Sequence, residues 1–264
     1  MIRNALIIAG ASFVLMLGCF AGVAALAGPT IMKEGWTIPF DEDADFDVKV
    51  GGSSHHVTVK GSTPSPTVSR EFAWSGGDFL KLDVPSNVEF IQGPVGKIEV
   101  TGPKSMVDRL TIEGGSIHVA DNIEGESLTI DRHGIRVQSG SDRLRIVVTA
   151  PGVRRFELSG SGDLEIQGFN QSSLSVTIDG SGDVSANGRV DTVEVKTNGS
   201  GSAYLEDLKT KDANVAILGS GGVEISPSDK VKIDITGSGD VSLESEATSV
   251  VSNVTGSGSV RHSY

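Results

Sequence analysis

The chain has 264 residues, of which 38% are hydrophobic, 5% are aromatic and 34 are glycine, and its formal net charge is −12. This apolar content is too high for a disordered chain, so we expect the glycines at the corners of a folded structure. The negative charge argues against a nucleic-acid-binding protein, which needs clustered Lys and Arg, and against adsorption to anionic lipid.

The N-terminal stretch, residues 5–27, contains no charged side chain and follows Arg3. Its 23 residues are enough to cross a bilayer as a helix. Two interpretations stay open. The stretch is either a secretory signal cleaved after Ala-Leu-Ala at residues 25–27, or an uncleaved anchor. We favour the anchor because the apolar run is longer than the usual signal core. Both interpretations predict an exported body, in the periplasm or at the cell surface.

Cys19 is the only cysteine, which excludes an intrachain disulfide. Leu17-Gly18-Cys19 partly matches a bacterial lipoprotein box. Met16 stands where that box has Leu, and apolar residues continue beyond the cysteine. An ordinary membrane-buried cysteine is therefore the favoured interpretation.

Residues 29–70 are expected to connect the N-terminal segment to the body. Trp36, Ile38 and Phe40 follow at alternating positions, which fits either a short strand or a Trp at the membrane interface. The acidic residues at 41–47 lack the glycine of an EF-hand loop, so a solvated linker is favoured over a calcium loop. Residues 51–69, rich in Gly, Ser, Thr, Pro and His, predict a connector or an irregular hairpin.

From Phe72 onward, apolar and polar residues alternate in short runs separated by Gly, Pro, Asn or Asp. This period of two predicts half-buried strands, and no stretch of helical period reaches a useful length. The apolar positions of these strands are Leu80, Leu82, Val84, Val88, Phe90, Ile98, Val100, Leu110, Ile112, Ile117, Val119, Leu128, Ile130, Leu144, Ile146 and Val148. The body is therefore predicted to be all-β.

The tripeptide Gly-Ser-Gly recurs in the C-terminal part at intervals of 20, 19, 20, 18 and 19 residues. A fixed period of this size indicates units that stack on one another. The six tripeptides begin at Gly160, Gly180, Gly199, Gly219, Gly237 and Gly256.

Four aliphatic columns flank these tripeptides. Two residues before the first glycine lie Leu158, Ile178, Thr197, Ile217, Ile235 and Val254. Four residues before it lie Phe156, Val176, Val195, Val215, Ile233 and Ser252. Four residues after it lie Leu164, Val184, Ala203, Val223, Val241 and Val260. Six residues after it lie Ile166, Ala186, Leu205, Ile225, Leu243 and His262.

The columns predict a right-handed parallel β-solenoid with coils of about 20 residues and a Gly-Ser-Gly corner in each coil. The hand follows from the general preference of parallel crossovers. Ser252 and His262 interrupt the columns in the last coil, as a polar cap would. A β-sandwich with regular hairpins remains the alternative, although it leaves the repeated tripeptide unexplained.

The chain resembles the head GIN domain family, also called "putative auto-transporter adhesin". The resemblance rests on Arg70-Glu71-Phe72, on residues 88–93 (VEFIQG), on residues 147–151 (VVTAP), and on residues 158–163 (LSGSGD) with the repeats that follow. It implies a bacterial envelope protein with a β-helix-like fold, and it carries no catalytic residues over. The expected domains are residues 1–28 as signal or anchor, 29–70 as connector and 71–264 as the β-solenoid, with regular repeats at 156–264.

Calcium is the first chemistry to weigh at the corners. Asp163 and Asp183 should stack in adjacent coils, with Asp179 across the same corner, and three carboxylates can hold a hard cation. Other coils have Ser202, Gly222 and Ser259 at the equivalent position, which breaks the row. We therefore favour Asp side chains that accept backbone N–H groups at the corner. A phosphate loop is rejected because the tripeptide leads into a strand rather than a helix.

Catalysis is not expected. If stacked, Asp163 and Asp183 would lie about 5 Å apart, which suits a retaining glycosidase but arises in any solenoid. His55 and His56 are adjacent, so on a strand they face opposite ways, and the sequence shows no Ser-His-Asp or Cys-His set. Trp and Tyr are too few for a sugar-stacking groove to be apparent.

The sequence therefore predicts a non-catalytic, exported cell-envelope scaffold or adhesion module, without cofactor, metal site or catalytic residue. The expected partner is an envelope protein or a glycan. The alternative is a carbohydrate-active or calcium-dependent glycan-binding module.

Overall fold

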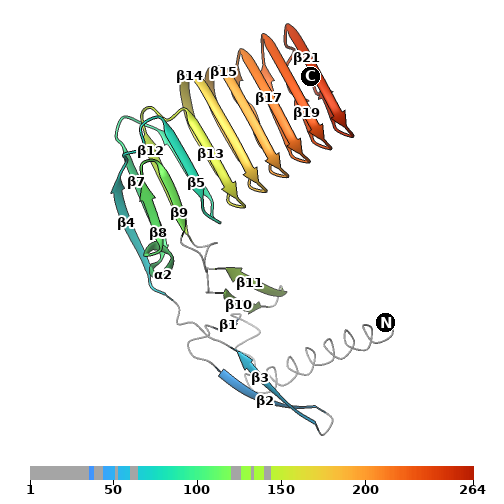
Figure 1. The fold of residues 1–264 in the computed structure, drawn as a ribbon. Coiled ribbons are helices and arrows are strands. Elements are labelled where there is room, and N and C mark those ends of the chain that lie inside the picture. The colour runs from blue at the N-terminus through green and yellow to red at the C-terminus, as the bar shows by residue number, and fades with distance from the viewer. Residues whose placement is uncertain are drawn as a thin grey trace. The chain divides into compact units, whose positions relative to one another are not determined.

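The computed structural model describes residues 65–119 and 144–264 in full, and the strands at 36–38, 44–50, 53–59, 126–131 and 134–139 by their backbone. The chain divides into two compact units (Figure 1). One unit comprises Met1–Ser65 and Glu124–Gly140, and the other comprises Pro66–Ile123 and Ser141–Tyr264. The domain boundaries expected at residues 28 and 70 stay predictions.

The described strands of the first unit form two small antiparallel sheets. Strand β1 (Trp36–Ile38) pairs with β10 (Glu126–Asp131), which pairs with β11 (Gly134–Ser139). Strands β2 (Ala44–Val50) and β3 (Ser53–Val59) form a hairpin. Trp36 therefore lies in a strand, and the expected connector contains regular hairpin structure. The expected membrane segment at residues 5–27 lies outside the described residues, and the described part of the chain contains no helix with the length and apolarity to span a bilayer.

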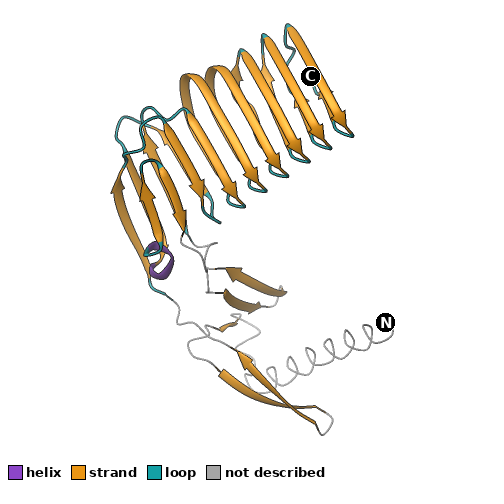
Figure 2. Cartoon of the chain, in the orientation of Figure 1, coloured by secondary structure: helices purple, strands orange, loops and turns teal. Residues whose placement is uncertain are grey.

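The second unit, over its described residues, consists mostly of strands and contains one short helix, α2 (Lys104–Val107) (Figure 2). Its strands are β4 (Thr67–Ala73), β5 (Phe79–Asp83), β6 (Val88–Gln92), β7 (Lys97–Pro103), β8 (Leu110–Glu113), β9 (Ser116–Val119), β12 (Arg145–Ala150), β13 (Arg155–Gly160), β14 (Leu164–Gly180), β15 (Val184–Gly199), β16 (Ala203–Thr210), β17 (Asp212–Gly219), β18 (Gly222–Pro227), β19 (Lys230–Gly237), β20 (Asp240–Leu243), β21 (Ser249–Gly256) and β22 (Ser259–His262).

The repeat region is a parallel β-solenoid of about five turns. The six first glycines pair in register from coil to coil, from Gly160 with Gly180 through to Gly237 with Gly256. All four predicted columns are confirmed: Val176 pairs with Val195, for example, and Val223 with Val241. The repetition of one tripeptide at one interval thus reflects stacked coils, and the β-sandwich alternative is wrong for this region.

The solenoid also contains a coil that the sequence pattern does not reveal. Strand β5 pairs in parallel with β13, and β6 pairs in parallel with β14, so Leu82 continues the column of Leu158 and Val88 that of Leu164. The turn between β5 and β6 has no Gly-Ser-Gly, which hides this coil from a search for the tripeptide. Strands β4, β7, β8, β9 and β12 then extend the two sheets beyond it.

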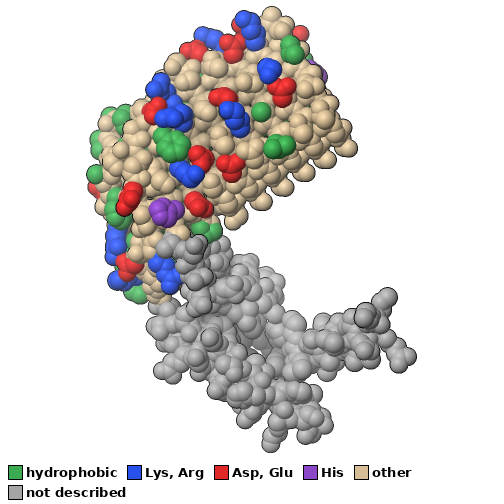
Figure 3. Space-filling view, in the orientation of Figure 1, with side chains coloured by type: hydrophobic (Ala, Val, Ile, Leu, Met, Phe, Trp, Pro, Cys, Tyr) green, Lys and Arg blue, Asp and Glu red, His purple; other side chains and the backbone are tan. Residues whose placement is uncertain are grey.

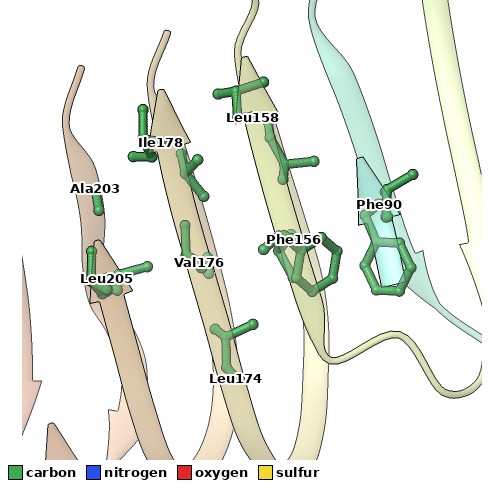
Figure 4. Close-up of a cluster of buried hydrophobic side chains, with 14 of the residues drawn as sticks. Phe90, Phe156, Leu158, Leu174, Val176, Ile178, Ala203 and Leu205 are labelled. Atoms are coloured by element: carbon green, nitrogen blue, oxygen red, sulfur yellow. The ribbon is translucent and has the colours of Figure 1, made fainter. Parts of the chain in front are cut away.

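The core lies between the two faces of the coil and is filled by the aliphatic columns (Figure 4). Aromatic side chains fill its N-terminal end, where the Phe90 and Phe156 rings meet edge to face with centroids 4.9 Å apart and the Phe156 and Phe169 centroids are 6.3 Å apart. Such pairs contribute about 0.5–1.5 kcal/mol each beyond their buried area. Thr197 is the polar member of a column and is fully buried.

Candidate functional site

The Gly-Ser-Gly corners stack along one edge of the solenoid. The Ser181 N–H donates to the Gly160 carbonyl at 2.9 Å, and the Ser200 N–H donates to the Gly180 carbonyl at 2.9 Å. The serine side chains of all six corners are exposed. In the space-filling view, the edge where β13 to β21 end shows neither charged nor hydrophobic side chains (Figure 3). This edge therefore presents hydroxyl groups and backbone.

The corner aspartates bind the backbone of the next coil, as the sequence interpretation favoured. Asp163 Oδ1 accepts the Asp183 N–H at 3.0 Å, and Asp183 Oδ1 accepts the Ser202 N–H at 2.8 Å. The Ser202 hydroxyl takes the same role one coil later and accepts the Gly222 N–H at 3.3 Å. A hydroxyl can therefore replace the carboxylate because both accept the same N–H group.

Asp240 repeats this arrangement near the C-terminal end. Its Oδ1 accepts the Ser259 hydroxyl at 2.6 Å and the Ser259 N–H at 3.0 Å. The hydrogen bond from the Ser259 hydroxyl lowers the pKa of Asp240, and the Arg261 guanidinium lowers this pKa further. Asp240 is thus held as a carboxylate that joins two coils.

The structure does not gather the three aspartates of the calcium hypothesis around one point. Asp179 lies on the face before the corner and accepts the Asn198 amide at 2.6 Å. Within residues 65–119 and 144–264, no group of three His, Cys, Asp or Glu side chains is placed to hold a metal ion. His118 lies in β9 opposite Thr111. His133 lies outside the described residues, and His55 and His56 are described by backbone only.

A groove of about 370 Å³, lined by charged, polar and aromatic residues, lies on the outer face after the corners. We call it the β6–β16 groove. The residues that line it come from β6, β12, β14, β15, β16 and the turns before them: Asn87, Val88, Glu89, Arg145, Ile146, Asp163, Leu164, Glu165, Asp183, Ser185 and Tyr204.

The register of the sheet explains the shape of the groove. Glu89 lies beside Glu165, Glu165 beside Ser185 and Ser185 beside Tyr204, all on the outer face of neighbouring strands. Ser185 is the smallest side chain of this row, so it leaves a depression between Glu165 and Tyr204. Arg145 closes the other side by an ion pair with Glu89 at 2.7 Å.

The groove offers one aromatic face and several hydrogen-bonding groups. Tyr204 is 39% exposed, so part of its ring is available for stacking. Glu165 accepts the Gln167 amide at 2.9 Å, which fixes one carboxylate. An aromatic platform beside fixed polar groups is typical of a site for a polyhydroxylated ligand.

Sequence reasoning identified Asp163 and Asp183 but missed the groove that they line. Tyr204 was recognised only as one of few aromatic residues, although its position between Ala203 and Leu205 marks it as outward-facing. Arg145 belongs to β12, which reaches the site through the pairing of β12 with β6. No sequence signal predicts that pairing, because it joins Val88 to Ile146, 58 residues later, with β7 to β11 lying between them in the chain.

A family model described as "putative auto-transporter adhesin, head GIN domain" matches residues 78–262, which span the whole solenoid. The chain belongs to the head GIN domain family. The resemblance noted from the sequence is therefore confirmed. The family description supports an adhesion-like role for this head GIN protein.

Solved structures agree with the fold. A "putative adhesin" from Bacteroides fragilis has a TM-score of 0.58 at 15% identity, covering 75% of this chain and 98% of its own. A "putative adhesin" from Parabacteroides merdae gives a TM-score of 0.38 at 13% identity, covering 74% and 95%. At these identities the likeness establishes the fold alone. That conclusion rests on the Bacteroides fragilis structure. No curated protein matches this head GIN protein.

Proposed function

We propose that this head GIN protein is an exported, non-catalytic adhesion module of the bacterial cell envelope that binds a glycan in the β6–β16 groove. Export and attachment to the membrane through residues 5–27 follow from the uncharged stretch in the sequence. We also retain the right-handed coil as part of the proposal, on the general preference of parallel crossovers.

The observation that carries the proposal is Tyr204 beside fixed carboxylates on a rigid ladder. A pyranose ring has an apolar face that stacks on an aromatic ring and hydroxyls that donate to carboxylates. Asp163 and Asp183 already use Oδ1 on backbone N–H groups, so their positions are set before a ligand arrives. Four carboxylates and one guanidinium line the groove, which favours a neutral or amino sugar over an acidic one.

A glycan array probed with the purified protein tests the proposal, followed by titration of the sugars that bind. Tyr204→Ala should weaken binding at least about tenfold, which corresponds to about 1.4 kcal/mol. Glu224→Ala is the matched control, because Glu224 lies beside Tyr204 in the same outer row but does not line the groove. Its affinity should equal that of the wild type.

Three results would contradict the proposal in distinct ways. Equal binding by Tyr204→Ala and wild type would exclude the groove as the site. Shortening of the bound glycan on long incubation would show catalysis. Loss of binding in EDTA would favour the alternative of a calcium-dependent module.

A further inference from the structure

The last described coil presents two strands with a free side. Strand β21 pairs with β19, and β22 pairs with β20. No other strand in the described part of the chain pairs with either one. Alternate residues of a parallel strand direct their peptide groups to opposite neighbours. Half of the peptide groups of β21 therefore face away from β19.

This free side lacks the usual protection against pairing. Edge strands commonly carry Lys, Pro or a bulge that prevents another strand from joining. Strand β21 has the sequence SVVSNVTG, with no charge and no proline, whereas its neighbour β19 (KVKIDITG) carries three charges. Within β21, Val254 is 40% exposed and Val251 is 61% exposed. The edge is thus long, uncharged and partly apolar.

The sequence of β21 is also self-complementary in one register. Val250, Ser252 and Val254 continue the inward columns of Val231, Ile233 and Ile235. An antiparallel pairing centred on Ser252 would keep inward side chains inward. It would place Val250 against Val254 of a second copy.

The antiparallel pairing centred on Ser252 relates the two copies by a two-fold axis through Ser252. The opposite sheet of the coil, which contains β22, fits the same axis. His262 lies four residues after Gly258, as Ser252 lies four residues before Gly256, so both lie at the same distance from the corner. A two-fold axis through Ser252 therefore also places His262 opposite His262 of the second copy. Val260, which continues the column of Val241, would meet Tyr264 of the second copy. Both sheets would then continue across the junction.

We propose that two copies of this chain join end to end through antiparallel pairing of β21 with β21. The charge distribution favours a second copy as the occupant. At a net charge of −12, two copies repel each other over most of their surfaces. Strands β21 and β22 contain one Lys or Arg and no Asp or Glu, and that residue, Arg261, is paired with Asp240 at 3.2 Å. The strands that would meet thus bring no carboxylate of their own to the junction.

A site-specific disulfide tests the register. In a full-length Cys19→Ser background, Ser252→Cys places one thiol on the two-fold axis. Directly opposed residues of an antiparallel hydrogen-bonded pair have Cα atoms about 5.5 Å apart, within the range of a disulfide. Mild oxidation should give a covalent dimer several times faster than for Thr255→Cys. Thr255 lies on the same strand and is also exposed, but in this register it does not lie opposite Thr255 of the second copy.

Equal crosslinking of the two cysteine variants, or none for Ser252→Cys, would overturn the proposal. A second measurement does not depend on oxidation. Ser252→Lys should reduce association in sedimentation velocity at least about tenfold, because two Lys side chains would meet at the axis, whereas Thr255→Lys should not. Equal association of the two lysine variants would also contradict the proposal. Glycan binding by single copies would be unaffected, so this test is independent of the proposed function.

Discussion

Gly180 and Gly182 of one corner are required for different reasons. Gly180 has a φ of +138°, a conformation that L side chains rarely adopt. Gly182 has no positive φ, but a Cβ there would lie 2.0 Å from the carbonyl oxygen of Gly162 in the preceding coil. The first glycine thus serves both the backbone conformation and the close approach of two coils, since a Cβ there would also lie 2.3 Å from the Gly160 carbonyl oxygen, whereas the second serves the close approach alone.

Gly182→Ala should therefore destabilise the protein by about 3 kcal/mol, because the backbone of the coil below cannot yield without breaking the ladder. Gly222→Ala is the control, since a Cβ at Gly222 would meet the Ser202 Oγ at 3.4 Å, an ordinary contact. Urea unfolding of the two variants checks this. Similar unfolding midpoints would contradict the close approach at Gly182.

Thr197 places a hydroxyl group at an inward-facing position of the solenoid. It is fully buried between Ile178 and Ile217, and its hydroxyl has no hydrogen-bond partner. A buried hydroxyl without a partner costs free energy that an apolar side chain of the same shape does not.

Thr197→Val should raise the free energy of unfolding by about 1 kcal/mol. The exposed Thr236 supplies the control, and Thr236→Val should change stability by less than about 0.5 kcal/mol. Guanidinium unfolding at neutral pH measures both. A destabilised Thr197→Val variant would show that the hydroxyl has a partner in solution, such as an internal water.

At the scale of the strand, burial alternates along the strand segments that flank each corner. Val215 and Ile233 are fully buried and pair with each other, whereas their neighbours Ala216 and Asp234 are half-buried on the outer face. Each inward position is covered by the same position of the coils above and below. A coil therefore cannot move one inward side chain without disturbing two neighbours.

Val215→Asp or Ile233→Asp should cost several kcal/mol and prevent folding, because each would bury a carboxylate without a partner. Ala216→Ser and Asp234→Ser, one position later on the same strands, should each cost less than about 1 kcal/mol. Circular dichroism during denaturant melts distinguishes the pairs. Equal tolerance at inward and outward positions would refute the register.

At the scale of the whole molecule, the fate of the N-terminus decides how the solenoid is displayed. If residues 5–27 are an anchor, protein extracted from membranes should retain Met1 or Ile2. Intact-mass spectrometry checks this. A mature chain that starts at Gly28 would instead indicate a cleaved signal, and a diacylglyceryl group on Cys19 would contradict both interpretations.

The sequence alone determined the repeat, the corner and the inward columns. These features can be recognised in the sequence because a period of two and a fixed interval between glycines suffice to align each coil with the next. The same regularity predicted that Asp163 and Asp183 accept backbone N–H groups at the corner, because Ser202 occupies the equivalent position in the next coil.

Only the tertiary structure revealed the first coil and the groove. The turn from Val84 to Val88 lacks the tripeptide, yet Gly162 packs against it, with its Cβ position 2.2 Å from the Val84 carbonyl oxygen. Arg145 reaches Glu89 because β12 pairs with β6 although β7 to β11 lie between them in the chain, and such pairings are set by packing rather than by local pattern. Tyr204 becomes part of a site for the same reason: its neighbours in space come from other coils, and Ser185 beside it leaves the space that a ligand needs.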